Sequence, residues 1–252
     1  MKNTAVDVKP VSVSGPNGRR NFLKMSGLAL AGTGLLIAGC SDDDDSISNE
    51  QQRPGIRNGV FDLGGGDLGI LTYAYALEQL EANFYTQVVN NTNFRSTFTT
   101  QEQEILVDLY NHEVIHREFF RTAITGALQQ AGGGTLLPDL TFNYGSLNFS
   151  NKADVLANAM ALEDTGVRAY NGAGRYLENL TYLGLAGKIV SVEARHAAAI
   201  RDLISPGSAS FAGDNIVDPA TGLDKADNPS VVIRDVKALN IIQTNFTAQY
   251  LR

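Results

Sequence analysis

The sequence predicts an all-α fold, a four-helix bundle with a long connection between its second and third helices. Four segments carry apolar residues at helical spacing, and a glycine-rich stretch over residues 131–150 separates the second segment from the third. Two of the three histidines also close the same motif, Glu-x-x-His, at Glu113–His116 and at Glu193–His196. Residues three positions apart lie on one helix face, so each motif can direct a carboxylate and an imidazole toward the same point.

Residues 1–39 are expected to be a signal peptide. An apolar run over residues 25–37 is too short to span a bilayer as a permanent helix and is typical of a signal-peptide core. The preceding string RRNFLK (Arg19–Lys24) resembles a twin-arginine export signal, with Gly18 where Ser or Thr is usual. The alternative, an amphipathic surface helix, has no polar face to support it.

The apolar run ends in Ile37-Ala38-Gly39-Cys40, which resembles the lipobox of bacterial lipoproteins. Cys40 is the only cysteine, so it has no partner for an internal disulfide. We therefore expect Cys40 to carry a lipid that anchors the protein to a membrane. A free thiol is the alternative interpretation.

Residues 40–66 are expected to form a lipidated acidic linker. The run SDDDD (residues 41–45) is either a solvated spacer or a signal resembling those that carry some lipoproteins to the outer face of the outer membrane. Residues 46–66 are polar and end in three glycines, which predicts a flexible linker.

The first predicted pair of helices covers residues 67–90 and 100–130. Asp67 is placed to cap the first helix, and Thr99 with Glu102 forms a capping box at the start of the second. Glu78 lies on the apolar stripe of the first helix. Glu113 and His116 lie in the middle of the second stripe, whereas a surface motif would fall on the polar face.

The second predicted pair covers residues 151–180 and 182–205, the latter ending before Pro206. Glu163 is the inward carboxylate of the third helix, and Glu193 and His196 are central in the stripe of the fourth. The bundle domain is thus expected over residues 67–205. Residues 206–252 are expected to form a C-terminal extension that packs on the bundle.

The two helix pairs look like copies of one unit. The segment ALEQLEANFY (76–85) aligns with ALEDTGVRAY (161–170), and in both a glutamate precedes a tyrosine by seven residues. Glu81 aligns with Gly166 and is therefore not expected to be a ligand. His112, one turn before His116, is expected at the surface or beside the ligands, with a metal role as the alternative.

These segments, with HEVIH (112–116) and EARH (193–196), resemble the ferritin-like superfamily, in particular exported bacterial proteins grouped with its stress- and desiccation-associated branch. The resemblance implies a carboxylate-bridged dinuclear metal site. Glu113 and Glu193 would be its bridging carboxylates and the candidate catalytic residues. Their partners would be the terminal carboxylates, the terminal imidazoles and the tyrosines that orient a carboxylate across the bundle: Glu78, Glu163, His116, His196, Tyr85 and Tyr170.

Four carboxylates and two imidazoles suit iron or manganese, and we expect two such ions per chain, with iron slightly favoured. Without metal the carboxylates would repel one another and some would take up protons. The alternative is a site in which buried Glu and His only form hydrogen bonds with each other.

The chemistry divides into two function classes. The first is an oxidoreductase, a ferroxidase or a peroxide-removing enzyme, whose reductant must come from elsewhere because the chain has no C-x-x-C pair. The second is a non-catalytic metal-binding envelope protein that protects against stress. The expected location is the periplasm or the cell-surface face of the outer membrane. The net charge of -7 and the absence of a basic cluster make nucleic acid an unexpected partner, and a homo-oligomer stays open.

Overall fold

Four long helices form the bundle in the computed structural model, which describes residues 48–251. They are α3 (Gly66–Val89), α5 (Thr100–Ala131), α6 (Lys152–Gly174) and α7 (Leu180–Ile204). The predicted all-α bundle is therefore confirmed. The predicted signal peptide, Cys40 and the acidic run lie outside the described residues.

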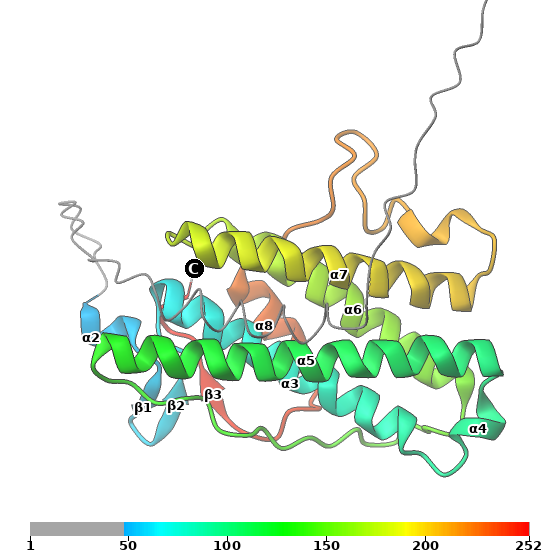
Figure 1. The fold of residues 1–252 in the computed structure, drawn as a ribbon, viewed down its shortest axis with the longest axis horizontal. Helices are drawn as coiled ribbons and strands as arrows, with labels where there is room; N and C mark the ends of the chain where they lie inside the picture. The colour runs from blue at the N-terminus through cyan, green and yellow to red at the C-terminus, as the bar shows by residue number, and fades with distance from the viewer. Residues whose placement is uncertain (1–47, 252) are drawn as a thin grey trace, which may run out of the picture. The chain divides into compact units, whose positions relative to one another are not determined.

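The bundle consists of two helical hairpins. Helix α3 packs along α5, and α6 packs along α7. The crossover between α5 and α6 runs the length of the bundle, so these two helices point in the same direction (Figure 1). Two shorter helical turns are α4 (Phe94–Thr97), in the connection between α3 and α5, and η1 (Ala209–Ala212), which follows α7.

Side chains at the helix ends explain most of the boundaries. Thr99 accepts a hydrogen bond from the backbone of Glu102, whose side chain accepts one from the backbone of Thr99, so the predicted capping box is present. Helix α5 ends at Ala131 and is capped by Gly132, which has a φ of 67° that glycine adopts without strain. Asn151 and Asn179 cap α6 and α7 with their side-chain oxygens.

The predicted cap at Asp67 is wrong. Helix α3 begins one residue earlier, at Gly66, and has no side-chain cap. The Asp67 carboxylate instead accepts hydrogen bonds from the backbone of Glu178 and Asn179, at 2.8 and 2.9 Å. It therefore ties the start of α3 to the turn between α6 and α7.

The third helix is shorter than predicted because it ends at Gly174 rather than at residue 180. Glycines at positions 172 and 174 weaken helical structure there. The backbone N–H groups of Tyr176 and Leu177 bond to carbonyls three residues earlier, which tightens the chain into a turn before α7.

The predicted flexible linker over residues 46–66 is wrong for most of its length. A short helix, α2 (Asn49–Gln52), precedes a hairpin of β1 (Gly55–Arg57) and β2 (Val60–Asp62). Strand β3 (Phe246–Thr247) pairs with β2 in parallel, so the three strands form one small sheet in the order β1-β2-β3. Its centre is Asp62, which is fully buried and accepts hydrogen bonds from Arg57, Gly64, Thr247 and Gln249.

The C-terminal extension packs on the bundle through α8 (Pro229–Ala238), which buries Val232 and Val236 against α6. The segment just before α8 lies very close to α6. The backbone N–H of Asp227 donates to the Arg168 carbonyl at 3.0 Å, and their side chains form an ion pair. A β-carbon at Gly172 would lie 1.7 Å from the Asp227 carbonyl oxygen, so only glycine allows this approach.

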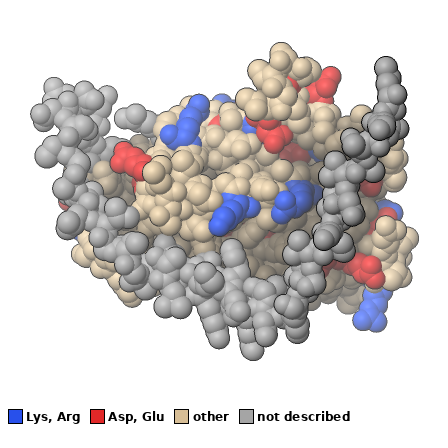
Figure 2. Space-filling model, turned by 45° about the horizontal axis from the view of Figure 1, so that its top comes forward, with Lys and Arg blue, Asp and Glu red and all other residues tan. Residues whose placement is uncertain are grey.

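The bundle interior is mostly apolar, but it contains a set of ionisable groups at its centre, described below. On the face shown in Figure 2, Lys and Arg side chains occur among Asp and Glu without forming one continuous patch. Within residues 48–251, no helix combines the length and the hydrophobicity that crossing a bilayer requires.

Candidate metal centre

Four glutamates and two histidines meet in the middle of the bundle. Each of the four long helices contributes one glutamate, and α5 and α7 each add the histidine of their Glu-x-x-His motif. The glutamates are fully buried, and the histidine side chains are nearly so. The six residues are Glu78, Glu113, His116, Glu163, Glu193 and His196.

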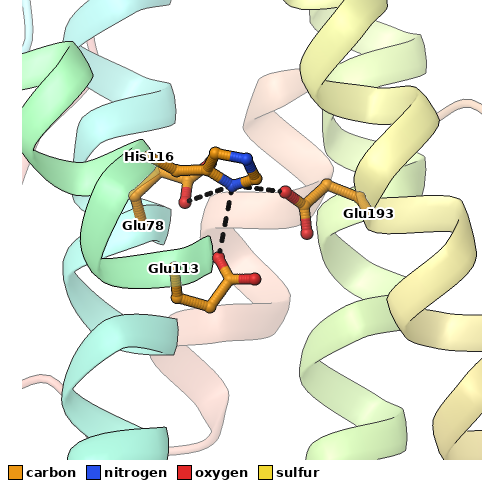
Figure 3. A group of neighbouring side chains, drawn as sticks. All are labelled: Glu78, Glu113, His116 and Glu193. Atoms are coloured by element: carbon orange, nitrogen blue, oxygen red, sulfur yellow. Dashed lines mark ion pairs between the residues drawn. The ribbon is translucent and has the colours of Figure 1, made fainter. Parts of the chain in front are cut away.

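The first group surrounds His116 (Figure 3). Its Nδ1 atom lies 2.8 Å from Glu193 Oε1, 3.5 Å from Glu78 Oε2 and 3.6 Å from Glu113 Oε2. These four residues come from α3, α5 and α7, and each offers one ligand atom within 4.8 Å of the others. The group could hold one metal ion.

The second group surrounds His196 in the same way. Its Nδ1 atom lies 2.7 Å from Glu113 Oε1, 3.5 Å from Glu193 Oε2 and 3.6 Å from Glu163 Oε2. The distances repeat those of the first group because the two hairpins are copies of one unit. This group too could hold a metal ion.

Glu113 and Glu193 belong to both groups. Each directs one carboxylate oxygen toward His116 and the other toward His196. A carboxylate shared in this way can bridge two cations. Each group takes three residues from one hairpin and the fourth from the other hairpin, so neither hairpin holds a complete group alone.

Eight atoms directed into this centre make no hydrogen bond: both oxygens of Glu113 and Glu193, one oxygen of Glu78 and of Glu163, and both histidine Nδ1 atoms. Buried polar atoms without partners are costly, and native proteins contain few of them. All eight are of atom types that can bind cations. Iron and manganese both accept carboxylate oxygens together with imidazole nitrogens as ligands. The residues present therefore fit a pair of metal ions.

Two tyrosines orient Glu78 and Glu163, the two glutamates that are not shared between the groups. The Tyr85 hydroxyl donates to Glu163 Oε1 at 2.5 Å, and the Tyr170 hydroxyl donates to Glu78 Oε1. Each bond runs from one hairpin to the other, as the resemblance to the ferritin-like superfamily implies. The bonds leave one oxygen of Glu78 and one of Glu163 directed at the centre.

Protons occupy the centre when cations are absent. Burial alone would lower the pKa of His116 and of His196, but the surrounding carboxylates outweigh it; they raise the pKa of His196 to about 12 and that of His116 still further. Burial raises the pKa of Glu113 to about 8, and it also raises that of Glu163. Burial opposes ionisation of Glu193 as well, but the positive charges of the two protonated histidines beside it lower its pKa to about 2.

These shifts predict that the metal-free protein loses stability as pH rises from 5 to 8. Across that window folded Glu113 and His196 retain protons that the unfolded chain releases near pH 4.5 and 6.5. The folded state then binds more protons, so the free energy of unfolding falls with increasing pH. Glu193 does not alter the slope, because its stabilising contribution is lost only below pH 4.5.

Chemical denaturation of chelator-treated protein at pH 5 and pH 8 measures this effect. Manganese should reduce the difference, because bound metal replaces the protons. The variant Glu113→Gln, which cannot ionise, should show a shallower pH dependence. An unchanged slope in that variant would contradict the assignment of the proton to Glu113.

An open groove of about 380 Å³ leads from the surface to the histidine side of the centre, between α5 and α7. His116 and His196 line this groove, together with apolar side chains and two charged ones, Asp108 and Arg195. His112 also lines it, and its Nδ1 atom lies 2.9 Å from His196 Nε2. This position agrees with the expectation that His112 lies at the surface or beside the ligands. The signal for it is the spacing of four residues between His112 and His116, which puts both on the same helix face.

Glu81 is buried but lies outside both groups of possible ligands. Its carboxylate occupies the space beside Gly166, where a β-carbon would lie 3.0 Å from Glu81 Oε1. Burial raises its pKa well above the usual range. The repeat alignment, which pairs Glu81 with Gly166 and excludes it as a ligand, agrees with this position.

Comparison with known families matches residues 66–206 to the ferritin-like domain. The matched segment covers more than half of the chain and contains all four long helices. Comparison with curated proteins finds no match.

Proposed function

The chain belongs to the ferritin-like domain family, and on that premise we propose that it binds two iron or manganese ions and carries out redox chemistry on ferrous iron, oxygen or peroxide. One observation carries the proposal. The two ligand groups share Glu113 and Glu193, which supports a single dinuclear centre over two separate sites.

Each residue has a distinct part in such a centre. Glu113 and Glu193 would bridge the ions, whereas the histidines, Glu78 and Glu163 would each bind one ion. The ions would supply one-electron chemistry and a place for a small oxidant to bind. The protein would hold them at fixed separation in the buried centre of the bundle, and Tyr85 and Tyr170 would keep the terminal carboxylates in place.

The groove between α5 and α7 favours the redox enzyme over a purely structural metal site. A structural site needs no route to solvent, whereas turnover requires one for substrate and product. The groove is lined by both histidines, and its volume of about 380 Å³ exceeds that of oxygen, peroxide or a hydrated ion. Asp108 and Arg195 also line it, so it offers charges of both signs.

Turnover measurements separate the two function classes. Protein loaded with iron or with manganese should consume hydrogen peroxide, or oxidise added ferrous iron, over many cycles. The variant Val192→Trp, which would fill the groove without changing a ligand, should retain its metal and lose most of the rate. A wild-type protein that binds two ions but turns over neither substrate would support the non-catalytic stress-protection function.

We also propose that the protein is an exported lipoprotein that faces the periplasm or the cell surface. The support is the sequence itself, with RRNFLK, the apolar run and Cys40 in the order that a lipoprotein leader has. A folded bundle exported by the twin-arginine route could receive its metal in the cytoplasm. We propose as well that the protein belongs to the stress- and desiccation-associated branch of the ferritin-like superfamily.

Substituting Lys for both Arg19 and Arg20 should block export and leave the protein in the cytoplasm, as cell fractionation would show. Substituting Ser for Cys40 should leave export intact and release the protein from membranes. Unchanged export of the Arg19→Lys, Arg20→Lys variant would exclude the twin-arginine route. Unchanged membrane association of the Cys40→Ser variant would exclude the lipid anchor.

A further inference from the structure

The two halves of the metal centre differ at one position that contacts a ligand. In the internal repeat, HEVIH (112–116) aligns with VEARH (192–196), so His112 is equivalent to Val192. Both residues line the groove between α5 and α7. The imidazole of His112 can accept a hydrogen bond, whereas the aliphatic side chain of Val192 cannot.

His112 contacts the outer edge of His196. The two rings are nearly parallel, at 9°, with centroids 5.2 Å apart, and the Nδ1 atom of His112 lies 2.9 Å from Nε2 of His196. The other nitrogen of His196, Nδ1, points inward, 2.7 Å from Glu113 Oε1. His196 therefore lies between the carboxylates on one side and His112 on the other.

This geometry fixes which nitrogen of His196 carries a proton when a cation is bound. A metal ion among the carboxylates would take the lone pair of Nδ1, so the proton of neutral imidazole would remain on Nε2. That N–H donates to Nδ1 of His112. A histidine ligand whose second nitrogen donates in this way is held in one tautomer and one ring orientation and becomes a stronger ligand.

We propose that His112 is a positioning residue that makes the two metal positions unequal, so that the position served by His196 binds a divalent cation more tightly than the position served by His116. The inference rests on the proposed metal-binding function. It adds an order of filling: the His196 position fills first and is the last to lose its metal. The hairpins, although copies of one unit, thus give two ions with different affinities.

Calorimetric titration of the full chain with Mn²⁺ tests the proposal. The wild type should show two binding steps of different affinity. His112→Leu should weaken the tighter step by about 10- to 100-fold, the usual effect of losing such a partner, and change the weaker step by less than about threefold. His112→Asn, which keeps an acceptor oxygen near the position of Nδ1, should recover much of the loss.

The matched control is Val192→Leu at the equivalent position, which should leave both steps within about threefold of wild type. Circular dichroism of the metal-free variants checks that each is folded. Two equal steps in the wild type, or equal weakening of both steps by His112→Leu without recovery in His112→Asn, would overturn the inference and leave the metal centre standing. Absence of any Mn²⁺ binding by the wild type would instead overturn the proposed function.

Discussion

Replacing Glu113 and His196 with alanine should abolish metal binding. The wild-type protein is expected to hold about two iron or manganese ions per chain, as bundles with this ligand pattern do, and the double variant close to none. The pair removes a carboxylate shared by both groups and one of the two imidazoles. Each remaining group then keeps too few ligands to offset the dehydration of a cation in the core.

Metal content by mass spectrometry, after anaerobic loading with iron and with manganese in turn, measures the effect and names the preferred ion. Glu118→Ala is the control, because Glu118 lies on α5 but is exposed and paired with Arg117. It should leave the metal content unchanged. A wild-type protein that retains no metal would show that the inward carboxylates are structural.

Gly172→Ala should destabilise the protein by about 3 kcal/mol, at the upper end of the cost of overpacking. The added β-carbon would lie 1.7 Å from the Asp227 carbonyl oxygen, which is far inside van der Waals contact. Helix α6 cannot move aside without disturbing Glu163 and Tyr170, so the segment around Asp227 must move. That movement would break its backbone bond and its ion pair to Arg168.

Thermal unfolding should show the loss as a decrease in Tm of about 6–12 °C for a domain of this size. Limited proteolysis should cut the C-terminal extension of the variant faster than that of the wild type. The control is Gly187→Ala on the exposed side of α7, where a β-carbon would meet no atom within 4 Å. It should stabilise the helix by about 0.5–1 kcal/mol, and a similar gain from Gly172→Ala would contradict the close approach.

The sequence was sufficient to predict the bundle and the meeting of the six ligand candidates. Apolar periodicity placed the four helices, and three-residue spacing put Glu113 with His116 and Glu193 with His196 on inward faces. Glu78 and Glu163 followed from the repeat, because each precedes a tyrosine by seven residues. These features depend on local geometry, which a helix determines from its own sequence.

The small sheet was missed although part of its signal is present in the sequence. Asn58-Gly59 is a strong hairpin signal, and both residues have the positive φ values, 50° and 79°, that such a turn requires. The strands of β1, β2 and β3 are only two or three residues long, too short for alternation to be visible. Pairing of β2 with β3 is a tertiary contact that no local pattern specifies.

One further difference has the same cause. The Asp67 carboxylate lies where a helix cap is expected, but it accepts hydrogen bonds from the backbone of the turn between α6 and α7 instead. His112 lies beside a ligand, as expected, but its contact with His196 on another helix is likewise tertiary. Side chains that choose a distant partner over a local one cannot be assigned from spacing alone.

The parallel pairing of β2 with β3 also bears on the order in which the chain can fold during synthesis. The contact between Asp62 and Thr247 joins residues 185 positions apart. The β1–β2 hairpin, which contains Asp62, emerges from the ribosome early, and domains tend to fold as they emerge. The four helices can assemble in that interval, but Asp62 must wait for Thr247 and Gln249. The sheet of β1, β2 and β3 therefore reaches its final structure only after residue 249 has been synthesised.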